Sequence, residues 1–233
     1  MRIVSARDDE ALVQYCIARL KDRDPGRRAE AALQLALLGG QSVPAVPALG
    51  QALEDPSVHV RKAAALAMGE IGPDARHGVA ALARALSDPD DAVRRRCALA
   101  LGTIGAEARQ AVPALVRALE GPGESAWRLA VAALGEIGPN AAAAIAPLIE
   151  LLAVDEARDR AIVLAALLKI GPRAVPRLIG ALAHTDPRVR MHAARALGKV
   201  GAPPEAVPAL EGLLSDPNGL VRETAAEALE PLE

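Results

Sequence analysis

A phrase of sequence recurs about every 33 residues, and this period restricts the possible folds more than any other feature of the chain. The phrase reads Asp-Pro, Val-Arg, an Ala-rich stretch, Leu-Gly-x-Ile-Gly and Ala-Val-Pro-Ala-Leu-x-x-Ala-Leu, and its clearest copy runs from Asp88 to Leu119. A fixed period of this length is typical of repeat proteins, in which each unit buries its apolar face against its neighbours. The leucine that closes each copy recurs at Leu20, Leu53, Leu86, Leu119, Leu152, Leu182 and Leu214.

Two further columns keep the same register. One is a mid-repeat glycine, at Gly39, Gly72, Gly105, Gly138, Gly171 and Gly201. The other is an arginine on the first helix, and this column reads Arg28, Arg61, Arg94, Trp127, Arg160, Arg190 and Arg222, with tryptophan in one place. An arginine repeated in this way predicts a pairing with an aspartate, or with a helix end, in a neighbouring repeat.

Each repeat predicts two helices. The aspartate of an Asp-Pro step such as Asp88-Pro89 can cap the first helix, and the proline suits its first turn. A glycine such as Gly72 then ends that helix in the left-handed conformation. The second helix begins near the Val-Pro step, because proline is tolerated only in a first turn, and one of its faces buries Val112, Leu115 and Leu119.

The composition predicts helices that pack closely together. Hydrophobic residues make up 52% of the chain but aromatic residues only 1%, so the core consists mainly of small and aliphatic side chains. A glycine inside a first helix costs roughly 1 kcal/mol in helix propensity, and the close approach of a neighbouring helix explains its presence. These interior glycines are Gly69, Gly102, Gly135 and Gly198.

The quoted columns resemble HEAT-like repeats of the phycobilisome-lyase type over roughly residues 10 to 229. This resemblance implies an all-α fold, a right-handed α-solenoid of about six two-helix HEAT-like repeats with half-repeat ends. We expect a single solenoid over residues 1–233, with an N-terminal half-repeat cap (1–20), six repeats (21–214) and a C-terminal half-repeat cap (215–233).

Repeats four and five depart from the pattern. Gly121-Pro122-Gly123 stands where Asp-Pro is expected, Trp127 replaces the arginine, and Leu168 replaces the interior glycine of the fifth repeat. One interpretation is neutral drift with local repacking. The other is a change in superhelix curvature, or a partner site around the only tryptophan, a residue type enriched at interface hot spots.

Charge and motifs argue against several classes of function. The net charge is −2, whereas nucleic-acid binders usually show a basic excess, so no nucleic acid is expected as partner. No metal-ligand spacing joins the four histidines, which we expect at the surface. The His-Glu pairs that the repeat family's metal hydroxylases carry are also missing from this sequence.

No phosphate loop or nucleophile motif occurs, so we expect no cofactor and no catalysis. Cys16 and Cys97 are expected as buried thiols.

The sequence also gives expectations about location. The N-terminus has no apolar region of the kind found in signal peptides, and no apolar run approaches the ~18 residues of a membrane-spanning helix. We therefore expect a cytoplasmic protein with no membrane partner, and the excess of arginine over lysine favours a bacterial source.

These observations predict a non-enzymatic scaffold or adaptor that binds a protein partner, such as an acidic peptide or helix, in a concave groove. The resemblance implies that the second helices line this groove. A chromophore-lyase-like or other cofactor-handling accessory protein is one alternative, and a structural spacer subunit of a larger assembly is another. The oligomeric state stays open. The candidate partner-binding residues are Gln51, His77, Arg84, Arg109, Arg117, Trp127, Glu150 and Arg177.

Overall fold

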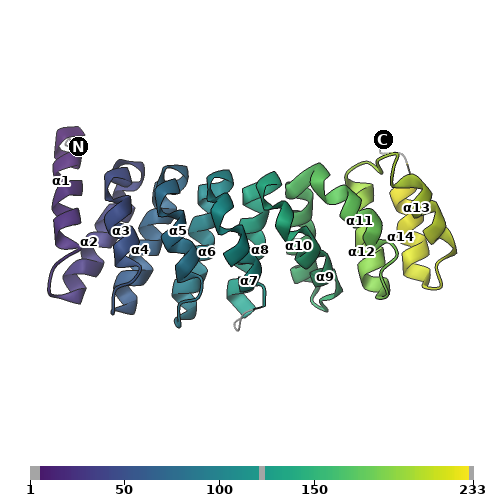
Figure 1. Ribbon diagram of the computed structural model, residues 1–233, viewed down its shortest axis with the longest axis horizontal. Coiled ribbons are helices and arrows are strands. Elements are labelled where there is room, and N and C mark those ends of the chain that lie inside the picture. Colours follow the sequence, from purple (N-terminus) through teal and green to yellow (C-terminus); the bar gives the residue numbers. More distant parts are fainter. Residues whose placement is uncertain (1–5, 121–123, 231–233) are drawn as a thin grey trace. The chain divides into compact units, whose positions relative to one another are not determined.

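The computed structural model describes residues 6–120 and 124–230, and all regular structure within them is helical (Figure 1). The predicted all-α fold of paired helices is confirmed. The residues group into two compact units, unit 1 (1–133) and unit 2 (134–233), and each is described by itself. How the ends divide into caps and repeats stays a prediction.

Unit 1 repeats one pattern: a long first helix, a 3₁₀ segment (η) and a short second helix. The first helices α2, α4 and α6 pack against one another in sequence order. The elements of unit 1 are α1 (Ala6–Arg19), α2 (Pro25–Leu38), η1 (Gly39–Ala45), α3 (Val46–Ala52), α4 (Val58–Ile71), η2 (Gly72–Gly78), α5 (Val79–Ala85), α6 (Asp91–Ile104), η3 (Gly105–Ala111) and α7 (Val112–Ala118), followed by α8 (Glu124–Ile137), which contains the boundary with unit 2.

Unit 2 also alternates long first helices with short second helices, but its 3₁₀ segments are irregular. Its elements after α8 are η4 (Gly138–Ala144), α9 (Ile145–Glu150), η5 (Leu151–Ala153), α10 (Ala157–Ile170), η6 (Gly171–Ala174), α11 (Val175–Ala181), α12 (Pro187–Lys199), α13 (Val207–Gly212), η7 (Leu213–Ser215) and α14 (Gly219–Leu229). Of the 3₁₀ segments, η4 has seven residues and η6 has four, and the described residues 200–206 join α12 and α13 without one.

The first helices α2, α4, α6 and α10 end at glycine, as predicted, but in a different conformation, and α12 ends at Val200 instead. Gly72 has φ 71° and ψ −141°, so its φ is positive while its ψ lies far from the left-handed helical value. Only glycine adopts such backbone angles readily, since it lacks a Cβ. The turn that follows is therefore a 3₁₀ segment rather than a left-handed cap.

The second helices begin at the Val-Pro steps, as expected, and they bury Val112 and Leu115. The closing leucine is less regular, because Leu119 is only half-buried. In the last repeat Leu213 is buried and Leu214 is 45% exposed. The inward-facing position thus lies one residue earlier in this repeat than in the copy that ends at Leu152, which is fully buried.

The Asp-Pro steps are of two kinds, which corrects the capping prediction. Asp24 and Asp186 cap α2 and α12 by accepting hydrogen bonds from the amides of Gly26 and Arg188, each at 2.8 Å. At the other steps the capping position lies two residues after the aspartate. Those aspartates, Asp55, Asp88 and Asp216, lie at repeat junctions, and Ser57, Asp90 and Asn218 occupy the capping positions.

The arginine column forms the predicted pairs. Arg61 donates from Nε and Nη2 to the carboxylate of Asp88 at 2.7 and 2.9 Å, and from Nη1 to the carbonyls of Asp55 and Pro56. Arg28 bonds Asp55 in the same way, and Arg190 bonds Asp216. Each arginine thus fixes its own junction and the next one, and we call these three pairs the ladder.

The ladder aspartate is replaced at three junctions. Val154 and His184 occupy two of its positions, and Gly121 occupies the third but lies outside the described residues. His184 keeps part of the role, because its Nδ1 accepts the amide of Asp186 at 3.0 Å, as a ladder aspartate accepts the amide two residues ahead. The sequence shows where the ladder aspartate is missing, but it does not show that His184 replaces it as a hydrogen-bond acceptor.

The interior glycines allow close packing, as predicted. A Cβ on Gly135 would lie 3.0 Å from the Cα of Ala166, and one on Gly198 would lie 2.9 Å from the Cα of Ala228. Leu168 takes this place on α10, and α10 packs more loosely against α12 than α12 packs against α14. A leucine side chain at the contact point keeps the two helix backbones apart.

Both cysteines are buried, as expected, and burial raises the pKa of the Cys97 thiol to about 12. The surface prediction is wrong for His192, which is only 4% exposed. Its Nδ1 has no hydrogen-bond partner within the described part of the chain. Burial, and then the charges of Arg160 and Arg195, lower its pKa to about 4. It occupies the position of buried Thr224 in the next repeat, so the register could have indicated burial.

Two stretches, Pro25–Ala52 and Ala126–Ala153, are long and apolar enough by length and composition to cross a membrane. In the first, a 3₁₀ segment that begins at Gly39 separates α2 from α3. The 14 residues of α2 span about 21 Å, less than the ~30 Å of a bilayer core. A similar 3₁₀ segment, η4, interrupts the second stretch.

Candidate docking surface on the second helices

Three of the predicted partner-binding residues share one place on successive second helices of unit 1. Gln51 on α3, Arg84 on α5 and Arg117 on α7 are all exposed. Arg84 donates to Glu54 at 2.8 Å, but both side chains are about two-thirds exposed, so the pair contributes little to stability. The guanidinium of Arg117 has no ion-pair partner among the residues that the structure describes, and it is therefore available to a ligand.

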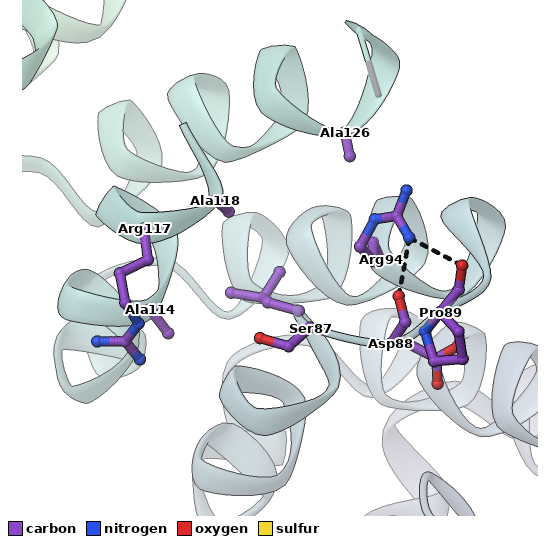
Figure 2. A pocket seen from close by; sticks show the side chains of 9 residues that line it. Ser87, Asp88, Pro89, Arg94, Ala114, Arg117, Ala118 and Ala126 are labelled. Carbon is purple, nitrogen blue, oxygen red and sulfur yellow. Dashed lines mark hydrogen bonds between the residues drawn. The ribbon is translucent and has the colours of Figure 1, made fainter. Parts of the chain in front are cut away.

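Arg117 lies at the rim of a pocket of about 460 Å³ in unit 1. The pocket opens between the junction that follows α5 and the helix α7, and Figure 2 shows Arg94 and Arg117 on two different sides of it. Apolar side chains supply much of the wall. Its lining consists of Leu86, Ser87, Asp88, Pro89, Arg94, Ala114, Arg117, Ala118 and Ala126.

The second guanidinium of the pocket is held in place. Nη1 of Arg94 donates to the carbonyl oxygens of Asp88 and Pro89 at 2.8 and 3.0 Å, and Nη2 donates to Asp91 at 3.0 Å. The carboxylate of Asp88 in turn binds Arg61, which offsets its charge. The pocket therefore combines an apolar wall with the exposed guanidinium of Arg117, while the guanidinium of Arg94 is held by its own partners and Asp91 offsets its charge. Arg117 can receive a carboxylate, and the apolar wall can receive a short apolar group beside it.

The remaining candidates of unit 1 lie outside this pocket. His77 in η2 and Arg109 in η3 are exposed but do not line it. Trp127 is half-buried rather than exposed, and the guanidinium of Arg128 lies 5.7 Å from the centre of its ring. The structure thus brings only Arg117 of the predicted set to the pocket.

Two predicted residues meet in unit 2. Glu150 on α9 and Arg177 on α11 line a pocket of about 350 Å³, and a carboxylate oxygen of Glu150 lies 3.5 Å from Nε2 of His184. The carboxylate of Glu150 is 70% exposed, whereas Asp88 in the pocket of unit 1 is paired with Arg61. A carboxylate ligand therefore meets more repulsion in the pocket of unit 2. His184 was not among the predicted residues.

Sequence reasoning missed Arg94 as a site residue, because its place in the arginine column assigned it a structural role. A usable signal was present in the register. The aspartates that pair with Arg28 and Arg61 follow 27 residues later, and the residue 27 positions after Arg94 is Gly121. The register therefore already set Arg94 apart from Arg28 and Arg61.

Across residues 6–120 and 124–230, no group of three or more His, Cys, Asp or Glu side chains is placed to hold a metal ion. Burial raises the pKa of both thiols, which disfavours the thiolate that nucleophilic chemistry requires.

The family profile of HEAT repeats matches residues 13–84, 79–169 and 155–230, which together cover most of the chain. The chain is a HEAT-repeat protein. This confirms the resemblance on which the fold prediction was based. No curated protein sequence matches it.

Solved structures with this fold include a phycocyanin lyase. The complex of CpcE and CpcF of phycocyanin lyase from Nostoc sp. PCC7120 is 27% identical, with a TM-score of 0.58 and 93% of each chain covered. An engineered protein is 23% identical, with a TM-score of 0.56 and 95% of each chain covered. Computationally designed armadillo repeat proteins for modular peptide recognition are 21% identical, with a TM-score of 0.48, over 95% of this chain and all of theirs.

Proposed function

We propose that this HEAT-repeat protein is a non-enzymatic adaptor that binds an acidic segment of a protein partner on the second helices of unit 1. The observation that carries the proposal is the pocket of about 460 Å³, with the exposed guanidinium of Arg117 beside an apolar wall. Solenoids generally bind partners along the surface formed by successive repeats.

The charged and the apolar residues that line the pocket have separate roles. Arg117 lies at the rim and binds the incoming carboxylate. Arg94 is held by the carbonyl oxygens of Asp88 and Pro89 and by Asp91, so it keeps the shape of the pocket wall fixed. A preformed wall loses little entropy on binding, so more of the interaction energy remains as affinity. Ala114 and Ala118 allow the backbone of the partner to approach closely.

The test compares wild type with Arg117→Glu in affinity capture from the native lysate, followed by a dissociation constant for the retained protein. We expect the charge reversal to weaken binding by roughly thirtyfold, which corresponds to about 2 kcal/mol. Arg109→Glu is the matched control, because Arg109 is equally exposed in unit 1 but does not line the pocket. An equal loss in both variants would assign binding to overall charge and would contradict the pocket.

A second candidate function is a component of a bilin lyase. The likeness to the CpcE and CpcF structure, at 27% identity over 93% of the chain, favours it. Against it, the chain has only two aromatic residues, Trp127 and Tyr15, to pack on a flat pigment. The visible spectrum of the protein mixed with a free bilin decides between the two: a shifted and intensified absorption band supports the lyase component, and an unchanged spectrum supports the adaptor.

A further inference from the structure

The first helices of unit 1 carry an exposed apolar column that the fold does not need. Leu33 on α2 is 45% exposed, Leu99 on α6 is 54% exposed, and Leu66 at the same place on α4 is half-buried. We call these three residues the leucine column. Leu37, one turn further along α2, is 81% exposed and extends it. The same register position in unit 2 holds Ala165, Arg195 and Glu227.

The same position of the repeat is thus apolar on these three helices of unit 1 but small or charged in unit 2. Single exposed leucines are common on protein surfaces and need no explanation. Here, however, three helices that pack side by side repeat the same apolar residue, whereas later copies of the position are small or charged. The repeat scaffold therefore does not require leucine at this position.

The leucine column borders a groove of about 530 Å³. Leu33 and Leu66 form part of its wall, and Ala29 and Ala63 leave room between α2 and α4. The groove lies on the first helices and shares no lining residue with the pocket at Arg117.

The rim of the groove is basic. Lys62 and Arg96 lie along it, and neither has an ion-pair partner within the part of the chain that the structure describes. The one acidic residue of the lining, Glu30, lies 3.7 Å from Arg19, which offsets its charge. An apolar groove with a basic rim is complementary to a ligand with an apolar stripe and acidic flanks.

We propose that the leucine column and its groove bind an amphipathic α-helix of a partner protein, with an apolar stripe flanked by glutamate or aspartate. Packed helices lie about 8–10 Å apart, and a helix rises 1.5 Å per residue. Apolar residues seven positions apart on the partner helix, about 10 Å along its axis, therefore match the spacing of successive leucines. Burial of the leucines drives binding, and Lys62 and Arg96 orient the partner.

A second copy of this chain is a poorer occupant. A symmetric contact between two copies places the same patch on both sides of the interface. Lys62 and Arg96 of one copy would then face the same cations of the other, and like charges oppose such a contact.

The probe is a labelled helical peptide with leucine at the first and fourth positions of each heptad and glutamate beside them. The comparison peptide carries lysine in place of every glutamate. Fluorescence anisotropy measures binding to wild type, to Leu33→Ser/Leu99→Ser and to Lys62→Glu/Arg96→Glu. The control variants are Leu220→Ser, an equally exposed leucine on α14, and Arg117→Glu, which removes the rim charge of the other surface.

We expect the glutamate peptide to bind wild type and both controls alike, and to bind the double-serine variant at least about tenfold more weakly, as the loss of buried leucine area requires. The lysine peptide should bind wild type more weakly and the Lys62→Glu/Arg96→Glu variant more tightly. Equal binding of the two peptides, an undiminished affinity for the serine variant, or no binding at millimolar peptide would overturn the proposal. Self-association of wild type that the serine substitutions abolish, seen by sedimentation, would assign the surface to a second copy instead.

Discussion

At the scale of single residues, the ladder shows how one side chain can fix two repeat junctions. Arg190 donates to the carboxylate of Asp216 and to the carbonyl oxygens of His184 and Thr185. This pairing lowers the pKa of the Asp216 carboxyl. The guanidinium therefore ties the start of α12 to the junction before it and to the junction that precedes α14.

The first prediction concerns this arginine. Arg190→Met should lower the free energy of unfolding by about 2 kcal/mol, because it leaves the buried carboxylate of Asp216 and two carbonyl oxygens without their donor. Arg188→Met on the same helix is the control, since Arg188 is exposed and the loss of its ion pairs should lower stability clearly less. Urea denaturation measures both values, and equal losses would show that the ladder has no special role.

The second prediction follows from His192. Its pKa is about 4 in the fold and about 6.5 in the unfolded chain, so the unfolded chain binds more protons between these values. Stability is therefore complete above about pH 6.5 and falls as the pH decreases towards 4. The pKa values of Asp55 and Asp216 are lowered from the ordinary value of 3.8, so their contributions are lost only below about pH 4.

Between about pH 7 and pH 5, wild type should lose roughly 2 kcal/mol more stability than His192→Met, which cannot take up a proton. Denaturation curves at the two pH values, recorded for both proteins, measure this difference. If the two proteins lose stability in parallel, a group other than His192 titrates in this range.

At the scale of elements, glycine controls how closely the first helices approach. Gly198 on α12 faces Ala228 of α14 at a distance that leaves no room for a methyl group, whereas nothing lies within 4 Å of the Cβ position of Gly180 on α11. The same substitution is thus expected to act in opposite directions at the two glycines.

The third prediction uses this pair. Gly198→Ala should destabilise by about 1–3 kcal/mol through overpacking, although alanine is the better helix former. Gly180→Ala should stabilise by about 0.5–1 kcal/mol, because the added methyl meets no neighbour and helix propensity improves. Melting temperatures should move down for the first and up for the second. A rise for both would mean that α12 and α14 are not held at contact distance.

The sequence predicts the helices well because their causes are local. Glycine at Gly72 and the Val-Pro steps set the ends of helices through backbone geometry alone. The capping at Asp88 could not be read in the same way, because Asp-Pro serves both as a cap and as a ladder junction, and the choice depends on contact with Arg61. The burial of His192 likewise depends on packing between elements.

At the scale of the whole molecule, the repeat provides two kinds of surface with separate chemistry. In unit 1 the second helices present Arg117 at a pocket, and the first helices present the leucine column. The register predicts which residues recur at each position. It does not predict the pocket, which depends on how α7 and the start of α8 pack beside the junction at Asp88.

The most direct test of the adaptor proposal is amide hydrogen exchange of the protein with and without its captured partner. The account predicts slowed exchange in α7 and in the junction at residues 86–89, with little change in η3 around Arg109. Arg117→Glu should abolish this protection under the same conditions. Protection confined to unit 2, or unchanged by Arg117→Glu, would contradict the assignment of the docking surface to the second helices of unit 1.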